Sequence, residues 1–144
     1  MFKNKNRSAV VQKRGFTLLE LLVVIVIIGL LAAFVAPKYF GQIGKSKIQT
    51  TKAQIDAFDK AIDQFRIDTG HFPMTEQGLN ILFSAPGNTE PLWHGPYLKK
   101  GVPADPWGNA YHYTAPGKTP GVDYEIVSYG EDGKDGNDDI SNLN

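Results

Sequence analysis

The chain has 144 residues, no cysteine and a formal net charge of zero, with fifteen Lys or Arg against fifteen Asp or Glu. The first fifteen residues carry five basic side chains and no acid, so the remainder is acidic, with a net charge of −5. This balance argues against nucleic-acid binding, and the lack of cysteine excludes a disulfide framework. The length leaves room for one small domain beside a long helix.

Residues 16–36 form an apolar run in which Glu20 is the single ionisable side chain. As a helix the run would span about 30 Å, enough to cross a bilayer. A charge within hydrocarbon costs about 2.5–3.5 kcal/mol and is usually paired. The basic residues 1–15 predict an N-terminus on the cytoplasmic side and a C-terminal domain on the outer side. We therefore expect a single membrane-crossing helix in which Glu20 has a partner.

A signal peptide and a permanent signal anchor are two other interpretations of this segment. A secretory signal peptide has a shorter apolar core and a small-residue cleavage site, whereas this run is long and is followed by an amphipathic pattern. A permanent signal anchor without cleavage fits the residues alone equally well.

Residues 37–70 are predicted to continue the helix, although Pro37 and the glycines at 41 and 44 weaken it. Apolar residues recur here at helical spacing and form one stripe: Ile48, Ile55, Phe58, Ile62 and Phe65. Such a stripe favours packing on the chain's own domain. A two-chain coiled coil needs more sustained heptads. Gly70 is the expected helix stop.

Residues 71–108 are rich in Pro and Gly and predict an irregular segment. Thr75 is a candidate cap for a short helix over about 76–84. Four apolar side chains are expected to pin the rest of the segment to the domain: Trp93, Tyr97, Leu98 and Trp107.

The segment 105–109 reads Asp-Pro-Trp-Gly-Asn, which predicts a turn. Residues 111–114 and 124–129 are aromatic or β-branched and predict two strands joined as a hairpin by residues 115–123. A small antiparallel sheet laid on the apolar face of the helix buries both surfaces. The predicted fold class is therefore α+β.

The last stretch, residues 130–140, holds five carboxylates and three glycines. Oxygen-rich ligands on a glycine-containing loop suit Ca²⁺, but the spacing does not match an EF-hand. A solvated acidic tail is the alternative. Ile140 and Leu143 are candidates for packing the end of the chain onto the domain.

Evidence for catalysis is weak. The three histidines, at 71, 94 and 112, have no metal-ligand spacing. The chain has no cysteine nucleophile and no Gly-x-Ser-x-Gly elbow. We expect a protein that is not an enzyme.

The sequence Gly15-Phe16-Thr17-Leu18-Leu19-Glu20 resembles the processing site of the type IV pilin family. Within that family, three further stretches resemble the major pseudopilins of type II secretion systems: residues 71–79, residues 105–111 and residues 128–133. Major type IV pilins usually close their C-terminal loop with a disulfide, whereas this chain has an acidic loop in that place.

The resemblance implies a type IV pilin-like fold, with a long N-terminal helix packed on a small sheet and an irregular region. It divides the chain into a leader over 1–15, an assembly helix over 16–36, its amphipathic continuation over 37–70, and a C-terminal region over 71–144. It implies cleavage between Gly15 and Phe16 by a prepilin peptidase, and N-methylation of Phe16. The new amine on Phe16 is then the expected partner of Glu20 in a neighbouring subunit.

The same resemblance implies a homo-oligomeric helical filament in the periplasm, anchored in the bacterial inner membrane before assembly. The filament would help to export folded proteins, and its implied partners are minor pseudopilins and the inner-membrane assembly platform. It also implies Ca²⁺ held by carboxylates and two backbone carbonyls: Asp132, Asp138 and Asp139 with the carbonyls of Tyr129 and Lys134. Asp135 is an alternative ligand. A type IV or competence pilin and a membrane-anchored calcium-binding domain are the other functions that these residues allow.

Overall fold

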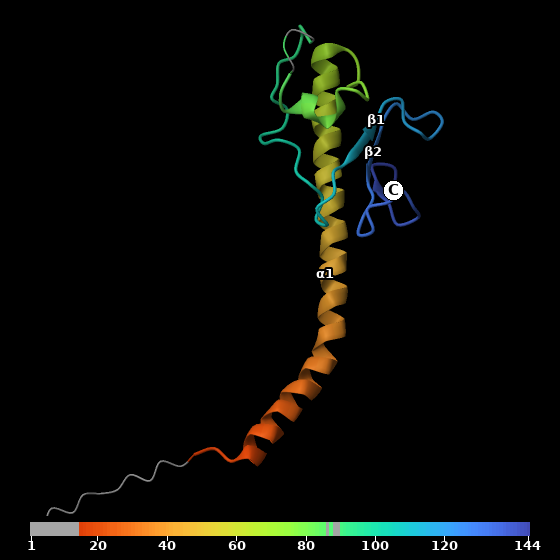
Figure 1. Ribbon diagram of the computed structural model, residues 1–144. Coiled ribbons are helices and arrows are strands. Elements are labelled where there is room, and N and C mark those ends of the chain that lie inside the picture. Colours follow the sequence, from red (N-terminus) through yellow and green to blue (C-terminus); the bar gives the residue numbers. More distant parts are fainter. Residues whose placement is uncertain (1–14, 86, 88–89) are drawn as a thin grey trace, which may run out of the picture. The chain divides into compact units, whose positions relative to one another are not determined.

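The computed structural model describes residues 15–85, 87 and 90–144 (Figure 1). Its contacts divide the chain into two units, Met1–Gly41 and Gln42–Asn144, each considered separately below. The basic part of the predicted leader, residues 1–14, lies outside the described residues. The elements in chain order are α1 (Leu18–Thr69), a 3₁₀ helix η1 (Gly78–Leu82), β1 (His112–Thr114), β2 (Glu125–Ser128) and β3 (Ile140–Ser141).

Helix α1 is continuous through Pro37 and ends one residue before Gly70. Gly70 has a φ of +83°, which residues with a side chain rarely adopt. Its N–H donates to the carbonyl of Arg66 at 2.8 Å, so the glycine both stops the helix and satisfies one of its last carbonyls. The predicted stop is therefore confirmed.

In the first unit, the apolar side chains of α1 are exposed. Leu18, Leu19 and Phe34 each keep more than two-thirds of their surface accessible, and the residues between them about half or more. A helix that is apolar all round and uncovered by its own chain needs lipid or another protein around it. By length and composition, α1 qualifies as a candidate membrane span.

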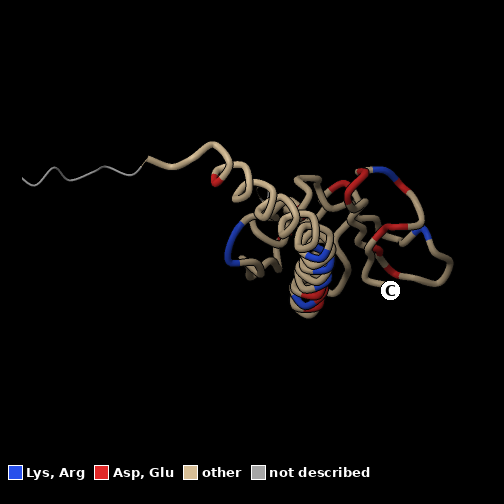
Figure 2. The backbone as a smooth tube through the Cα atoms, turned by 90° about the horizontal axis from the view of Figure 1, so that it is seen from below, with Lys and Arg blue, Asp and Glu red and all other residues tan. Residues whose placement is uncertain are grey.

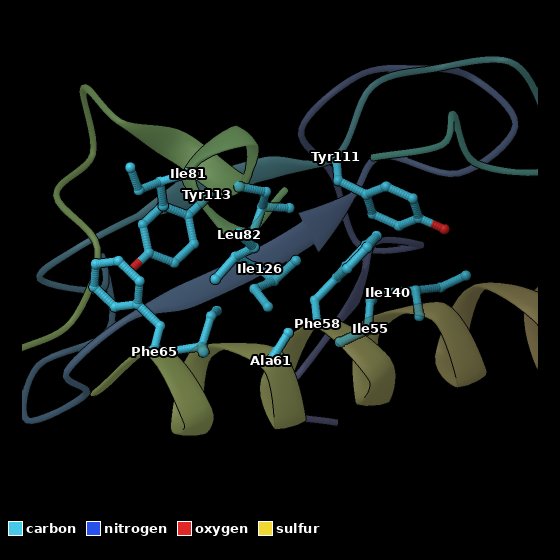
Figure 3. Close-up of a cluster of buried hydrophobic side chains, with 12 residues drawn as sticks. Ile55, Phe58, Ala61, Phe65, Ile81, Leu82, Tyr111, Tyr113, Ile126 and Ile140 are labelled. Carbon is cyan, nitrogen blue, oxygen red and sulfur yellow. The ribbon is translucent and has the colours of Figure 1, made fainter. Parts of the chain in front are cut away.

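In the second unit, one face of α1 forms half of the core. Ile55, Phe58, Ile62 and Phe65 are at most 2% exposed, which confirms the predicted stripe for these four residues. Figure 3 shows the helix side chains directed toward Ile126 on β2. Ile48 was also assigned to the stripe, and this is wrong, because it keeps 42% of its surface exposed. On α1, the core cluster begins at Ile55.

The sheet has the order β1-β2-β3 and is antiparallel throughout. Tyr113 pairs with Ile126 across β1 and β2, and Ser128 pairs with Ile140 across β2 and β3. Alternation along β2 directs Ile126 and Ser128 to the interior. The hairpin of β1 and β2 was predicted, whereas β3 was not, because a two-residue strand carries no periodicity of its own.

The irregular segment is held to the core by its aromatic side chains. The indole N–H of Trp93 donates to the carbonyl of Ile81 at 2.8 Å, and the Tyr97 hydroxyl donates to Asp68 at 2.8 Å. Trp93, Tyr97, Leu98 and Trp107 all pack against the core cluster, as predicted. Figures 1 and 2 show the irregular segment on one side of α1 and the sheet on the other. Side chains from both belong to, or pack against, the same core cluster.

The role predicted for Thr75 is wrong. Helix η1 begins at Gly78 and has no side-chain cap. The Thr75 hydroxyl instead accepts the N–H of Ala115 at 2.9 Å and donates to its carbonyl at 3.0 Å. Thr75 therefore occupies the backbone groups that follow β1 at the edge of the sheet, a long-range contact that the local sequence does not indicate.

Candidate functional site

The first candidate site is the start of α1, where Thr17 and Glu20 satisfy each other's backbone groups. The Glu20 carboxylate accepts the N–H of Thr17 at 2.9 Å and its hydroxyl at 3.0 Å. The Thr17 hydroxyl accepts the N–H of Glu20 at 3.2 Å. This reciprocal arrangement is a capping box, which occupies two of the backbone donors left free at a helix start.

Sequence reasoning missed this capping box, although the Thr-x-x-Glu spacing before an apolar run indicates it. In the single chain, the Glu20 carboxylate is bonded only within its own helix end, among the described residues. Gly15 and Phe16, the residues of the predicted cleavage site, are exposed. A Cβ added at Gly15 would meet nothing within 4 Å among the described residues.

The second candidate site is the acidic loop, defined here as residues 129–139, and its base is held by a buried carboxylate. Asp105 is 4% exposed. Its Oδ1 accepts the N–H groups of Trp107 at 3.0 Å and Asn109 at 2.8 Å. Its Oδ2 accepts the Ser128 hydroxyl at 2.6 Å. Three donors compensate the cost of burying this charge.

The turn at 105–109 was predicted, but its connection to the acidic loop was not. The Ser128 hydroxyl also accepts the N–H of Gly130 at 3.3 Å, and the Asn109 amide donates to the carbonyl of Gly130 at 2.9 Å. The turn therefore holds Gly130, where the loop leaves β2, in two ways. Asn109 bonds its carbonyl directly, and Asp105 holds the Ser128 hydroxyl that accepts its N–H. A serine at an inward position of a strand is the sequence signal that could have indicated a buried polar partner.

Within the loop, carboxylates close short turns. Asp132 Oδ1 accepts the N–H of Lys134 at 2.9 Å, and both carboxylate oxygens of Asp139 lie 3.2 Å from the N–H of Gly136. At the other end, β3 returns the chain to the sheet with Ile140 6% exposed. This confirms the predicted packing of Ile140, whereas Leu143 stays 45% exposed and its predicted packing is wrong.

Asp138, near the end of the loop, lies close to two of its glycines. Its Oδ2 is 3.6 Å from the point where a Cβ of Gly130 would stand, and its Oδ1 is 3.2 Å from the corresponding point at Gly136. The carbonyl oxygen of Lys134 is 3.7 Å from that same point at Gly136. Asp138 Oδ1 and the Lys134 carbonyl oxygen thus both lie close to the same side of Gly136.

The donor set suits a hard cation, because it consists of carboxylate and carbonyl oxygens. Over residues 15–85, 87 and 90–144, however, no three His, Asp or Glu side chains are gathered as metal ligands. Asp135 stands apart in an exposed ion pair with Lys118 at 3.3 Å. The hydrogen bond that Lys118 donates to this carboxylate is the main cause of the raised pKa of Lys118.

Two family models match this chain, one over each of the two candidate sites. Residues 38–143 match the family model for protein G of the type II secretion system, and residues 11–36 match the prokaryotic N-terminal methylation motif. The chain belongs to the type II secretion system protein G family. The curated relatives include the type II secretion system core protein G of Pseudomonas aeruginosa, 44% identical over 89% of this chain and 90% of the relative. That of Vibrio cholerae is 40% identical over 92% and 93%.

A solved structure agrees with this protein G family assignment. The crystal structure of the major pseudopilin from the type 2 secretion system of enterohaemorrhagic Escherichia coli matches with a TM-score of 0.61 and 34% identity. The match covers 72% of this chain and 91% of that one. The pilin-like α+β fold predicted from sequence is confirmed. As a member of the protein G family, the chain is a structural subunit of the secretion pseudopilus.

Proposed function

We propose that the chain is made with a leader that a prepilin peptidase removes between Gly15 and Phe16, and that Phe16 is then N-methylated. Before assembly, the subunit crosses the bacterial inner membrane once, with its N-terminus in the cytoplasm and residues 42–144 in the periplasm. It then leaves the membrane to join a helical filament of identical subunits. Minor pseudopilins and an inner-membrane assembly platform are its partners, and it performs no catalysis.

The observation that carries this proposal is the apolar half of α1, which its own chain leaves uncovered and which begins with one acid. Around one such helix, either lipid or copies of the same helix bury the exposed side chains. Cleavage creates a cation on Phe16, four residues before Glu20, so neighbouring helices can neutralise both charges while setting their relative height. The match to the secretion family disfavours a type IV or competence pilin.

The test is Glu20→Ala in cells that carry the secretion system. We expect mass spectrometry to find the leader removed and Phe16 methylated as in the wild type, and electron microscopy to find filaments reduced at least about tenfold, since an uncompensated charge at each contact costs several kcal/mol. Glu76→Ala, the same change at an exposed residue of the domain, is the matched control and should assemble normally. Normal filaments from Glu20→Ala would contradict the pairing.

We also propose that the acidic loop binds Ca²⁺ through the carboxylates of Asp132, Asp138 and Asp139 and the carbonyls of Tyr129 and Lys134. In support, Asp138 Oδ1 and the Lys134 carbonyl oxygen both lie close to Gly136, and a bound cation would offset the repulsion among the acids. Its role would be structural. A membrane-anchored calcium sensor is the alternative, and it predicts a loop that changes while the melting temperature of the domain does not.

A further inference from the structure

The charges beyond the apolar half of α1 are sharply segregated along the chain. Residues 37–55, called the basic segment here, contain four lysines and no acid: Lys38, Lys45, Lys47 and Lys52. Fourteen of the fifteen acids follow from Asp56 onward, where only six Lys or Arg accompany them, so that part has a net charge of −8. The acids in the loop that leads to the C-terminus are red in Figure 2.

The lysines of the basic segment form no ion pair with any acid in residues 15–85, 87 and 90–144. Lys38, Lys45 and Lys52 are exposed, and they share one helix face because they are seven residues apart. Lys47 is half-buried, with its ammonium 5.7 Å from the ring centre of Trp107. In the part of the chain that the structure describes, the ion pairs involve other residues. Among the described residues, Lys38, Lys45 and Lys52 therefore form no ion pair, whereas Lys47 contacts Trp107.

The basic segment is also close, along the helix, to the apolar half that enters the membrane. Lys38 is two residues beyond Ala36, and Lys45 is nine, which corresponds to about 14 Å of helix. Exposed Tyr39 and Phe40 lie between them, and aromatic residues are enriched at membrane interfaces. The basic residues 1–15 favour a cytoplasmic N-terminus, and lysines at the other end of the apolar half oppose that orientation. The positive-inside rule therefore does not explain the lysines of the basic segment.

We propose that the basic segment docks on anionic phospholipid head groups of the leaflet that faces the domain, before the subunit joins a filament. The same surface repels the −8 charge that follows from Asp56 onward, so attraction and repulsion together would hold the acidic loop away from the membrane. This inference rests on the membrane-inserted state proposed above but not on assembly.

The absence of native cysteine provides the test. Ser46→Cys places a unique fluorescent label between Lys45 and Lys47, at an exposed position. The full chain is reconstituted at low protein density in phosphatidylcholine vesicles, with or without phosphatidylglycerol. Quenching by acrylamide, which is uncharged and is supplied on both sides, measures how accessible the label is. Because the subunits are not assembled, failure here is distinguishable from failure of the filament proposal.

We expect quenching to fall roughly twofold or more in the anionic vesicles, and about 0.5 M NaCl to restore it by screening. Lys45→Gln with Lys52→Gln should remove the effect, whereas Lys99→Gln with Lys100→Gln, the same change in an exposed pair outside the segment, should preserve it. Equal quenching in neutral and anionic vesicles would overturn the proposal. So would protection that depends on protein density instead of lipid charge, because it would identify acids of a second copy as the partner.

Discussion

The first half of α1 and the domain that follows use the same apolar residues in opposite ways. Ile27 keeps 50% of its surface exposed and Ile62 none, although both are isoleucines on one helix. The difference is what the chain places opposite each of them. The domain supplies its own sheet and irregular segment, whereas the first half of the helix is completed only by lipid or by other subunits.

The carboxylates of Asp105 and Glu20 differ in the same way as the regions that contain them. Asp105 is buried and receives three donors from three residues of its own domain. Glu20 is exposed and receives two donors, both from Thr17. The first carboxylate holds the fold together, while the second, under the proposed function, would exchange its local partners for a charged one on a neighbouring subunit.

The largest expected contrast comes from one substitution made in both regions. Ile62→Ala leaves a cavity in the core and should lower the free energy of unfolding of the domain by about 2–5 kcal/mol. Ile27→Ala, the matched control, should change it by less than about 0.5 kcal/mol. Denaturant unfolding of the full chain in detergent, followed by the fluorescence of Trp93 and Trp107, measures both. Equal effects would show that the two regions are not independent.

Asp105→Ala should have the next largest effect, because it leaves two half-buried N–H groups and the buried Ser128 hydroxyl without their acceptor. We expect a loss of roughly 2–4 kcal/mol in the free energy of unfolding. Asp105→Asn should lose less, since its carbonyl can still accept from the two N–H groups. The same unfolding measurement separates them. If alanine and asparagine behaved alike, the hydrogen bonds to Oδ1 would not be the stabilising contacts.

Removal of calcium tests the acidic loop. If Ca²⁺ binds only the folded domain, saturation a hundred-fold above the dissociation constant should add about 2.7 kcal/mol to stability, and a chelator should abolish the gain. Asp138→Ala should remove this response. Asp135→Ala, which breaks only the exposed pair with Lys118, should retain it. Thermal melts of the wild type and of both variants, each with Ca²⁺ or with a chelator, measure the effect. If Asp135→Ala abolished the calcium response and Asp138→Ala did not, the ligands would have to be reassigned.

The smallest expected effect concerns Asp59 on α1, whose Oδ1 accepts the Tyr124 hydroxyl at 3.0 Å. Burial is the main cause of its raised pKa, with Asp63 and Asp56 adding repulsion. A raised folded pKa means that the stability contributed by this group is present below its unfolded pKa of about 3.9 and is lost as pH rises through the folded value.

Asp59→Asn keeps the hydrogen-bond acceptor and removes the charge, so it should match the wild type near pH 3 and become more stable above about pH 5. The gain should be a few tenths of a kcal/mol, because the group is partly exposed. Melting temperatures across this pH range provide the measurement. A variant that is less stable than the wild type at neutral pH would mean that the Asp59 charge is compensated by a partner.

The elements with strong local signals were predictable from sequence. The stripe of Ile55, Phe58, Ile62 and Phe65 has helical periodicity, and Gly70 has the backbone freedom that a helix stop requires. What escaped prediction depends on partners distant in sequence. The bond of Thr75 to Ala115 crosses forty residues, and the two residues of β3 become a strand only because β2 is beside them.

The sites divide in the same way. Glu20 was identifiable because one acid in an apolar run is costly and therefore has a purpose. Asp105 was assigned only to a turn, because its role depends on Ser128, which is brought to it by the sheet. The acidic loop was recognisable by composition, but the position of Asp138 between Gly130 and Gly136 required the fold.

The central claim is that Glu20 exchanges its bonds within one chain for a charged partner on another. Electron cryo-microscopy of assembled filaments, at a resolution that separates side chains, tests it most directly. The account predicts a Glu20 carboxylate oxygen within about 3 Å of the Phe16 nitrogen of a different subunit. A Glu20 that is still bonded only to Thr17 of its own chain, as in the isolated subunit, would contradict it.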